Sequence, residues 1–188
     1  MSNDVGDKIV QLHQQTKSYV DEIKKWVHAN RESNKSAIIS YFTYSLNISH
    51  NPEHESLCLG SYHVQNIGNQ PITNPYICIK IPTDSPFSFS GRYTYENFKQ
   101  SLKNAGGWER LNDKANIEEF WLKPSGKTVI APDETISFSN FQIKWIANAD
   151  YAGSIMGFAF SDQQKEGVTV INPINLNGTV HRQEENNE

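Results

Sequence analysis

Residues Ser56–Pro82, SLCLGSYHVQNIGNQPITNPYICIKIP, carry the clearest indication of the fold. They consist of two runs of strand-forming residues, separated by a segment rich in Asn, Gly and Pro. This pattern is typical of two β-strands joined by a turn. In the second run three isoleucines alternate with Cys78 and Lys80, which predicts a strand with one apolar and one polar face.

The only two cysteines of the chain, Cys58 and Cys78, lie in this stretch. Cys58 shares its phase with Tyr62 and Val64, the expected buried set of the first strand, whereas Cys78 falls on the polar face of the second. Directly paired residues must share a face to form a disulfide. We therefore expect two free thiols, as is usual for a cytosolic protein.

The composition and charge of the chain exclude some classes of function. The 188 residues carry a net charge of -4 and 37% hydrophobic residues, and the pI is about 5.9. A nucleic-acid-binding protein would need a basic surface, so we expect no nucleic-acid partner. The sequence contains no apolar run of 18 residues, so we expect no membrane span. Its N-terminus lacks the charged region and following apolar region of a secretory signal peptide, so we expect a cytoplasmic protein.

Residues 3–32 have helical periodicity. One set of mostly apolar residues recurs at alternating spacings of four and three. This spacing predicts a long amphipathic helix whose apolar stripe follows the heptad repeat, the seam of a coiled coil. Two interpretations remain open: the stripe packs on the protein's own body, or the helix projects to self-associate as a short coiled coil or to dock on a protein partner. The polar seam residues His13 and Thr16 weaken an autonomous coiled coil. The candidate interaction residues are Ile9, Leu12, Val20, Ile23, Trp26 and Val27.

From Ser36 the period changes to two, and about eight short strands follow at intervals of roughly 8–12 residues. The sequence therefore predicts a mainly β chain, an antiparallel immunoglobulin-like two-sheet sandwich after the N-terminal helix. Its expected parts are a helix and hinge (1–35), a sandwich (36–180) with an irregular or helical insertion around 95–123, and a disordered acidic tail (181–188). A change of phase near Ser139–Asn140 predicts a β-bulge.

Two segments resemble bacterial immunoglobulin-like domains of adhesion-like modules. Residues 62–82 contain an Asn-x-Gly-Asn turn between two strands, and residues 131–138 are similar to the later Pro-Gly-Asp/Glu turn, with Asp133 where Gly is common. The resemblance covers about a third of the chain. It implies a fold and says little about activity, because the shared motifs are turns.

His50-Asn51-Pro52-Glu53-His54 matches the H-x-x-E-H motif of inverted zinc proteases. That motif needs a helix to place both histidines on one side of a metal ion, and Pro52 between two expected strands argues for a solvated turn instead. We therefore expect no metal and no cofactor, with His50 and His54 as weak candidate ligands only.

An aromatic platform for sugars is the second candidate. Trp108 follows a Gly-Gly pair beside Glu109 and Arg110, so it is the aromatic residue expected to be most exposed, and Arg110 and Trp121 complete this possible ligand platform. The competing interpretation is core packing, which is the commoner place for aromatic residues in sandwiches.

No nucleophile elbow, phosphate loop or acid/base pair with the right spacing occurs in the sequence. The chain is therefore expected to be a non-enzymatic structural module for protein–protein interaction or assembly, with the helix mediating self-association or docking; the resemblance implies a bacterial protein. The alternative is a carbohydrate-binding sandwich that uses exposed aromatic residues near Trp108.

Overall fold

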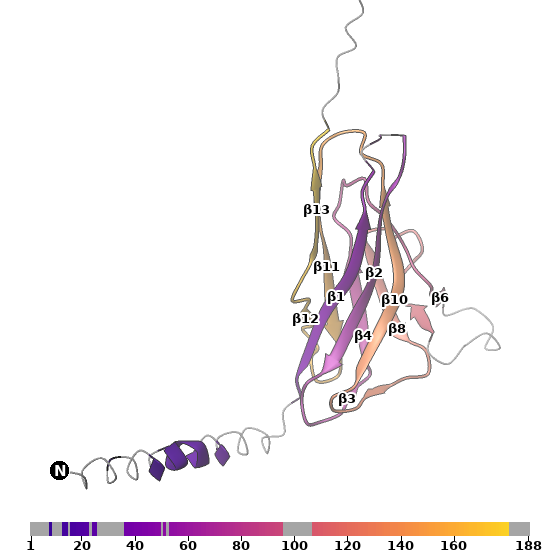
Figure 1. Cartoon of the computed structure of the whole chain (residues 1–188). Helices are drawn as coiled ribbons and strands as arrows, with labels where there is room; N and C mark the ends of the chain where they lie inside the picture. The colour runs from indigo at the N-terminus through magenta and orange to yellow at the C-terminus, as the bar shows by residue number, and fades with distance from the viewer. Residues whose placement is uncertain are drawn as a thin grey trace, which may run out of the picture. The chain divides into compact units, whose positions relative to one another are not determined.

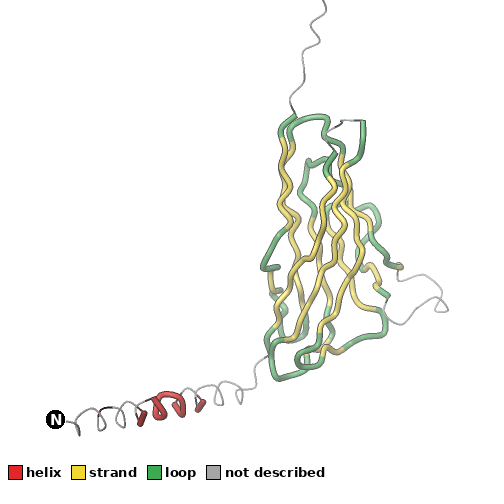
Figure 2. The backbone as a smooth tube through the Cα atoms, viewed as in Figure 1, coloured by secondary structure: helices red, strands yellow, loops and turns green. Residues whose placement is uncertain are grey.

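A computed structural model of the chain describes residues 8, 13–14, 16–22, 24–25, 36–49, 51, 53–95 and 107–180. The chain divides into two units, Met1–Lys35 and Ser36–Glu188. In the first unit the longest continuous helical run that the structure describes covers residues 16–22. The second unit is made of strands and loops over its described residues (Figure 2).

Two sheets face each other in the second unit (Figure 1). The smaller has the strand order β1-β2-β10-β5, and the larger has the order β12-β11-β4-β8-β7-β6, with β13 also paired to β11. All strand pairs are antiparallel except the parallel pair β6–β7. The mainly β two-sheet sandwich predicted from the sequence is confirmed. The strands are β1 (Ile38–Asn47), β2 (Ser56–Asn66), β3 (Ile72–Thr73), β4 (Tyr76–Lys80), β5 (Ser88–Ser90), β6 (Thr94–Tyr95), β7 (Trp108–Arg110), β8 (Glu119–Pro124), β9 (Val129–Ile130), β10 (Thr135–Trp145), β11 (Tyr151–Phe160), β12 (Val168–Thr169) and β13 (Ile174–Gly178).

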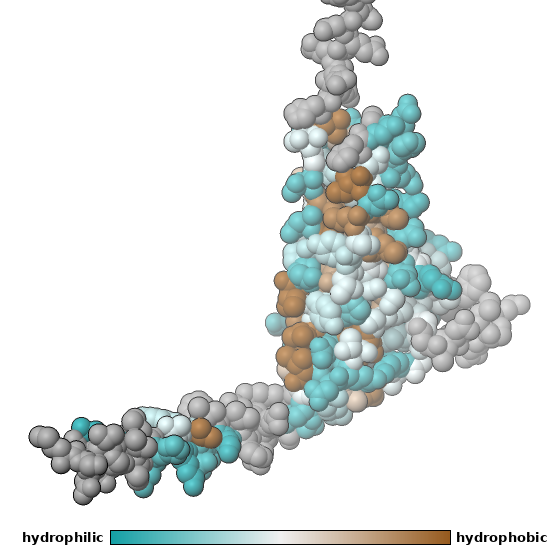
Figure 3. Space-filling view, in the orientation of Figure 1, coloured by the Kyte–Doolittle hydropathy of each residue, from teal (hydrophilic) through white to brown (hydrophobic). Residues whose placement is uncertain are grey.

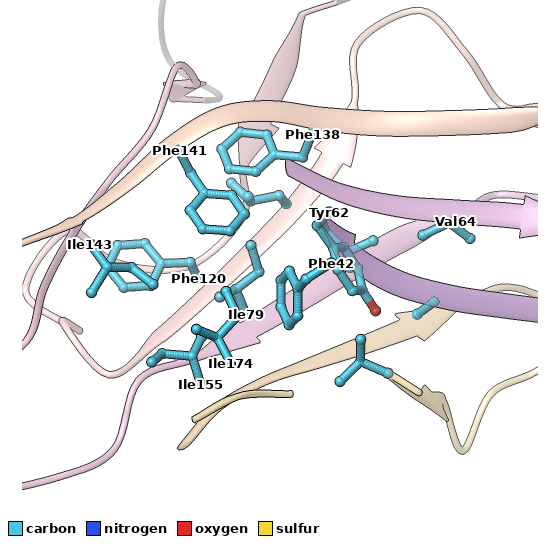
Figure 4. Packing of buried hydrophobic residues seen from close by; sticks show 14 of the residues in the cluster. Phe42, Tyr62, Val64, Ile79, Phe120, Phe138, Phe141, Ile143, Ile155 and Ile174 are labelled. Carbon is cyan, nitrogen blue, oxygen red and sulfur yellow. The ribbon is translucent and has the colours of Figure 1, made fainter. Parts of the chain in front are cut away.

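The core fills the space between the two sheets. Phe42, Tyr62, Phe138 and Phe141 project from the smaller sheet toward Ile79 and other residues of the larger one (Figure 4). Residues on strands alternate between the two faces of a sheet, so every second residue of β2, and of β1 as far as Phe42, lies in this core. Burial of these aliphatic and aromatic side chains is the main stabilising contribution.

The β-bulge predicted near Ser139–Asn140 is confirmed. The pairing of β10 with β2 shifts between Phe138 and Phe141, and Asn140 has a φ of 60°. The extra residue reverses the phase of β10, so that Phe138 before the bulge and Phe141 after it both point into the core.

The two strands of Ser56–Pro82 lie in different sheets, whereas the sequence suggested neighbouring strands. β2 pairs with β1 and β10, and β4 pairs with β8 and β11. The connection between them passes from one sheet to the other through β3, which pairs with β9. Both cysteines are free and buried; they lie on different strands of different sheets, which agrees with the expectation of two free thiols.

The Asn66 turn explains how the chain leaves the first sheet. The Asn66 side chain is fully buried; its amide nitrogen donates to the carbonyls of Gln70 and Ile130, and its oxygen accepts from the Gly68 N–H. Asp133, in the turn that faces it, has a φ of 62° and donates its N–H to the Asn66 carbonyl. Asn and Asp tolerate this left-handed region better than most residues, which accounts for Asp133 where Gly is common.

The long amphipathic helix predicted over residues 3–32 is not supported beyond the described helical positions, and no coiled coil is supported. Every described residue of this unit is exposed, including Tyr19 at 66% and Val20 at 43%. Of the predicted interaction stripe only Val20 is described; Ile9, Leu12, Ile23, Trp26 and Val27 lie outside the described residues. Of the irregular or helical insertion expected around 95–123, residues 96–106 lie outside the described residues, and residues 107–123 contain β7 and the greater part of β8, two strands of the larger sheet. The acidic tail 181–188 also lies outside the described residues.

Among the described helical residues, none belongs to a helix long and apolar enough to cross a membrane.

Candidate functional site

Three aromatic side chains meet on the outer face of the larger sheet. They are Tyr76 on β4, Trp121 on β8 and Phe160 on β11, and all three are half-buried. The inner positions of the same strands carry core residues, so strand alternation turns these three rings away from the core. We call Tyr76, Trp121 and Phe160 the aromatic patch.

The rings of the patch are in mutual contact. Tyr76 and Phe160 stack with their centroids 4.9 Å apart and their planes at 6°. The Trp121 ring lies 5.2 Å from Phe160 and 6.2 Å from Tyr76, tilted by 35° and 36°. Such offset contacts stabilise each ring pair by about 0.5–1.5 kcal/mol beyond area burial. The patch is therefore an ordered surface.

Trp121 extends across its neighbouring strand. β8 and β11 are separated by β4, so their backbones are about 9–10 Å apart, yet the Trp121 and Phe160 rings are 5.2 Å apart. Cys78, the cross-strand partner of both Trp121 and Phe158, lies between them and is only 3% exposed. The small thiol thus leaves room for the indole to lie over the sheet, and burial raises the pKa of Cys78 to about 12.

A carboxylate fixes the orientation of the indole. The Trp121 Nε1–H donates to Glu119 Oε2 at 2.9 Å, and Lys80 Nζ lies 3.4 Å from the other carboxylate oxygen, Oε1. The hydrogen bond from Trp121, together with Lys80, lowers the pKa of Glu119 below its usual value. Glu119 is therefore ionised at neutral pH and keeps the indole in one position.

A hollow of about 450 Å³ adjoins the patch at Tyr76. Its lining includes Asn74, Lys123, Asp162 and Lys165. Asp162 Oδ2 accepts hydrogen bonds of 2.7 Å from the Thr73 hydroxyl and the Asn74 amide, and the Thr73 bond is the largest cause of the lowered pKa of Asp162. The hollow thus presents an ionised carboxylate, an amide and ammonium groups next to an aromatic ring, within the size range of small-molecule sites.

The predicted platform residues are not brought together. Trp108 is 6% exposed: it lies in the core edge-on to Phe138 at 5.6 Å, and its Nε1–H donates to the Ser137 carbonyl at 3.0 Å. Arg110 is 4% exposed and holds the loop that follows β7 through carbonyl oxygens. The expectation of an exposed Trp108 is therefore wrong; of the three residues, only Trp121 lies on the outer face.

The candidate metal ligands do not form a described site. His50 and Pro52 lie outside the described residues. Around them, the His54 N–H donates to the Asn51 carbonyl at 3.1 Å and the Glu53 N–H donates to the Asn51 side chain at 2.9 Å, which is the hydrogen bonding of a turn. Among the described residues, no three His, Cys, Asp or Glu side chains are grouped to hold a metal ion.

Sequence reasoning missed Tyr76 and Phe160. The signal for Tyr76 was present, because it shares its phase with Cys78 and Lys80 and must face outward with them. Phe160 was hidden, because β11 carries apolar residues on both faces and its alternation does not separate inside from outside.

Comparison with known proteins gives no family. No family model matches the chain, and no curated protein matches it. Among solved structures, it is similar to a mutant of carbohydrate-binding module CBM3b from the cellulosomal cellobiohydrolase 9A of Clostridium thermocellum, with 11% identity, a TM-score of 0.41, and coverage of 73% of this chain and 99% of that one.

Two glycosidase structures match over a small share of their own length. An inactive mutant of the GH20 exo β-N-acetylglucosaminidase from Vibrio harveyi has 11% identity and a TM-score of 0.31, with 74% of this chain and 17% of that chain covered. A family GH18 chitinase from Chromobacterium violaceum has 7% identity and a TM-score of 0.32, with 69% and 18% covered. The chain thus spans less than a fifth of either glycosidase, and these similarities assign it no family and no ligand.

Proposed function

We propose that this chain is a non-enzymatic carbohydrate-binding sandwich, and that the aromatic patch with its adjoining hollow is the binding site. The observation that carries the proposal is the Trp121 indole, held over the outer face by Glu119 with Tyr76 and Phe160 beside it. This is the alternative that the sequence left open, moved from Trp108 to a different surface.

The chemistry of the patch matches that of a sugar. One face of a pyranose ring carries C–H groups and is apolar, and it packs on the electron-rich face of an aromatic ring. Its hydroxyl groups both donate and accept hydrogen bonds, so they need partners of both kinds within reach of the stacking ring. Lys123 and Lys165 supply donors, Asp162 supplies an acceptor, and Asn74 supplies both beside Tyr76.

A binding role also agrees with the fixed geometry of the site. The patch is ordered before a ligand arrives, because Glu119, Lys80 and the ring contacts already hold Trp121. A preformed site avoids the entropy cost of ordering side chains on binding. Glu119 and Lys80, which lie beside Trp121, are already paired with each other, so the surface over the aromatic patch favours a neutral ligand over a strongly charged one.

The proposal is tested by binding of the full chain to a glycan array and to insoluble cellulose, chitin, xylan and mannan. We expect retention on at least one polysaccharide, and Trp121→Ala should weaken it by about 30-fold, the change that corresponds to loss of about 2 kcal/mol at a central aromatic contact. Leu59→Ala removes an exposed apolar side chain from the other sheet and should leave binding unchanged. No retention on any glycan, or equal loss in both variants, would refute the proposal.

The second candidate is docking of a protein partner by the N-terminal unit. The described residues that favour it are Tyr19 and Val20, two apolar side chains exposed at 66% and 43%. Replacing both with Ala should reduce capture of a partner protein while leaving glycan binding intact, which separates the two functions.

A further inference from the structure

The outer edge of β1, the edge that does not face β2, is hydrogen-bonded along its first half and, among the described residues, open along its second half. β1 pairs with β2 on one side only, from Ile38 opposite Asn66 to Asn47 opposite Leu57. In an antiparallel strand, every second residue directs both its N–H and its C=O to the same edge. The Phe42 N–H donates away from β2, to Asn172, so Tyr44 and Leu46 direct their backbone groups to this same outer edge.

The first half of this edge is already occupied. The Ile171 N–H donates to the Ser40 carbonyl at 2.9 Å. The Asn172 side chain then contacts Phe42 twice at 2.8 Å, accepting from its N–H and donating to its C=O. Beyond Phe42, the described residues provide no hydrogen-bond partner for the outward backbone groups of Tyr44 and Leu46.

The open half of the edge is apolar and uncharged. Tyr44, Leu46 and Ile48 are 43%, 43% and 44% exposed, although their phase is that of the core. Residues 36–49 contain no Asp, Glu, Arg, Lys or Pro. Proteins usually protect an edge strand with a charge, a proline or a bulge, since unpaired backbone groups recruit another strand. Hydrophobic residues gather over the part of the molecule where β1 and β2 run (Figure 3).

We propose that a second copy of this chain pairs with this edge, β1 against β1, in antiparallel orientation about a two-fold axis at Ser45. Tyr44 then lies opposite Leu46 of the second copy and Leu46 lies opposite its Tyr44. Both residues direct their backbone N–H and C=O groups to the outer edge of β1. Each of the two pairs therefore exchanges two backbone hydrogen bonds, and the contact forms four backbone hydrogen bonds in total. The two smaller sheets join into one continuous sheet of eight strands.

The features of this strand select a second copy as the occupant. A two-fold contact must be complementary to itself, and Tyr44 beside Leu46 gives an apolar pair on one face whichever copy is considered. Each chain has a net charge of -4, so two copies repel each other in general. β1 carries no charged residue, so it adds nothing to this repulsion at the contact. Asn172 at Phe42 and the end of β1 at Asn47 limit the pairing to residues 43–47, and this fixes the register.

The register is tested by disulfide trapping with the full chain under mild oxidation. Residues that face each other at a non-hydrogen-bonded antiparallel position have Cα atoms about 4.5 Å apart, which is within disulfide range. Ser45→Cys should therefore form a covalent dimer. Asn47→Cys alone and Thr43→Cys alone should not, whereas an equimolar mixture of those two variants should. The native thiols of Cys58 and Cys78 are buried and should not contribute.

Reversible association gives a second readout by sedimentation velocity over a range of protein concentrations. We expect a monomer–dimer equilibrium whose dissociation constant rises at least 10-fold in Ser45→Lys, because two ammonium groups then meet at the axis. Ser139→Lys, at an exposed position of the same sheet, should leave it unchanged. A monomer at all concentrations, equal cross-linking of all single variants, or association indifferent to Ser45→Lys would overturn the proposal; the last would indicate a contact elsewhere, as through the N-terminal unit.

Discussion

Replacing Arg110 by Met should destabilise the sandwich, because this one buried side chain holds the loop between β7 and β8. Arg110 is 4% exposed, and its guanidinium lies over the Phe120 ring at 4.4 Å. Nε donates to the Asn112 side chain at 3.0 Å, and Nη2 donates to the carbonyls of Asp113, Asn116 and Glu119. No exposed charged residue of the sandwich should matter as much to its stability.

The expected loss in the free energy of unfolding follows from these contacts. A hydrogen bond from a charged donor contributes about 1.5–3 kcal/mol, but the Asp113 and Asn116 residues are exposed, so their carbonyls regain water when the arginine is lost. Methionine also keeps most of the packing on Phe120. We therefore expect a loss of about 3 kcal/mol in the free energy of unfolding, equivalent to a fall in Tm of about 6–12 °C for a chain of this size.

The assay is urea unfolding followed by far-ultraviolet circular dichroism, with Arg92→Met as the matched control. Arg92 is exposed, and its replacement should change the free energy of unfolding by less than about 0.5 kcal/mol. The m-value should stay constant, since the folded surface is unchanged. A loss below about 1 kcal/mol in Arg110→Met would show that the loop is held by other contacts and would refute the role given to Arg110.

Two further predictions concern stability. Asn66→Ala removes three hydrogen bonds and leaves the buried Ile130 carbonyl without one of its partners; we expect a loss of about 2–3 kcal/mol by urea unfolding, and a loss within error would contradict the role given to this turn. Burial raises the pKa of Cys58 to about 11 and of Cys78 to about 12, from 9.0, so the unfolded thiols lose their protons first and stability should fall as pH rises above about 9. Replacing both cysteines by Ala should flatten this decline between about pH 9 and 11, and an unchanged slope would show that other groups cause it.

The sequence predicted the positions of the strands better than the pairing between strands. Alternation indicates which face of a sheet a residue occupies, but it does not indicate which strand lies beside it. The period of two along β1 and the phase change at Asn140 have local causes, and both were readable. The separation of β2 and β4 into two sheets depends on β3 meeting β9, a pairing of Ile72 with Ile130 across a long stretch of chain, and no local pattern signals it.

The candidate site was predicted only in part, for a similar reason. Trp108 looked exposed because it follows two glycines and precedes charged residues, yet all three residues of β7 are buried. Glu109 reaches Lys123 on the neighbouring strand, and Arg110 is satisfied by carbonyls of the following loop. Buried charges of this kind depend on partners that only the folded chain supplies.

Tryptophan fluorescence during titration with the retained polysaccharide bears directly on the aromatic patch as the binding site. Of the four tryptophans, Trp108 and Trp145 are buried, Trp121 lies on the outer face, and Trp26 lies outside the described residues, so the Trp121 variant is needed to assign the change. We predict that saturation changes the emission of the native protein, and that Trp121→Phe abolishes this change while keeping measurable binding through the phenyl ring. The same emission change in Trp121→Phe, with unaltered affinity, would place the ligand elsewhere and contradict the assignment of the aromatic patch.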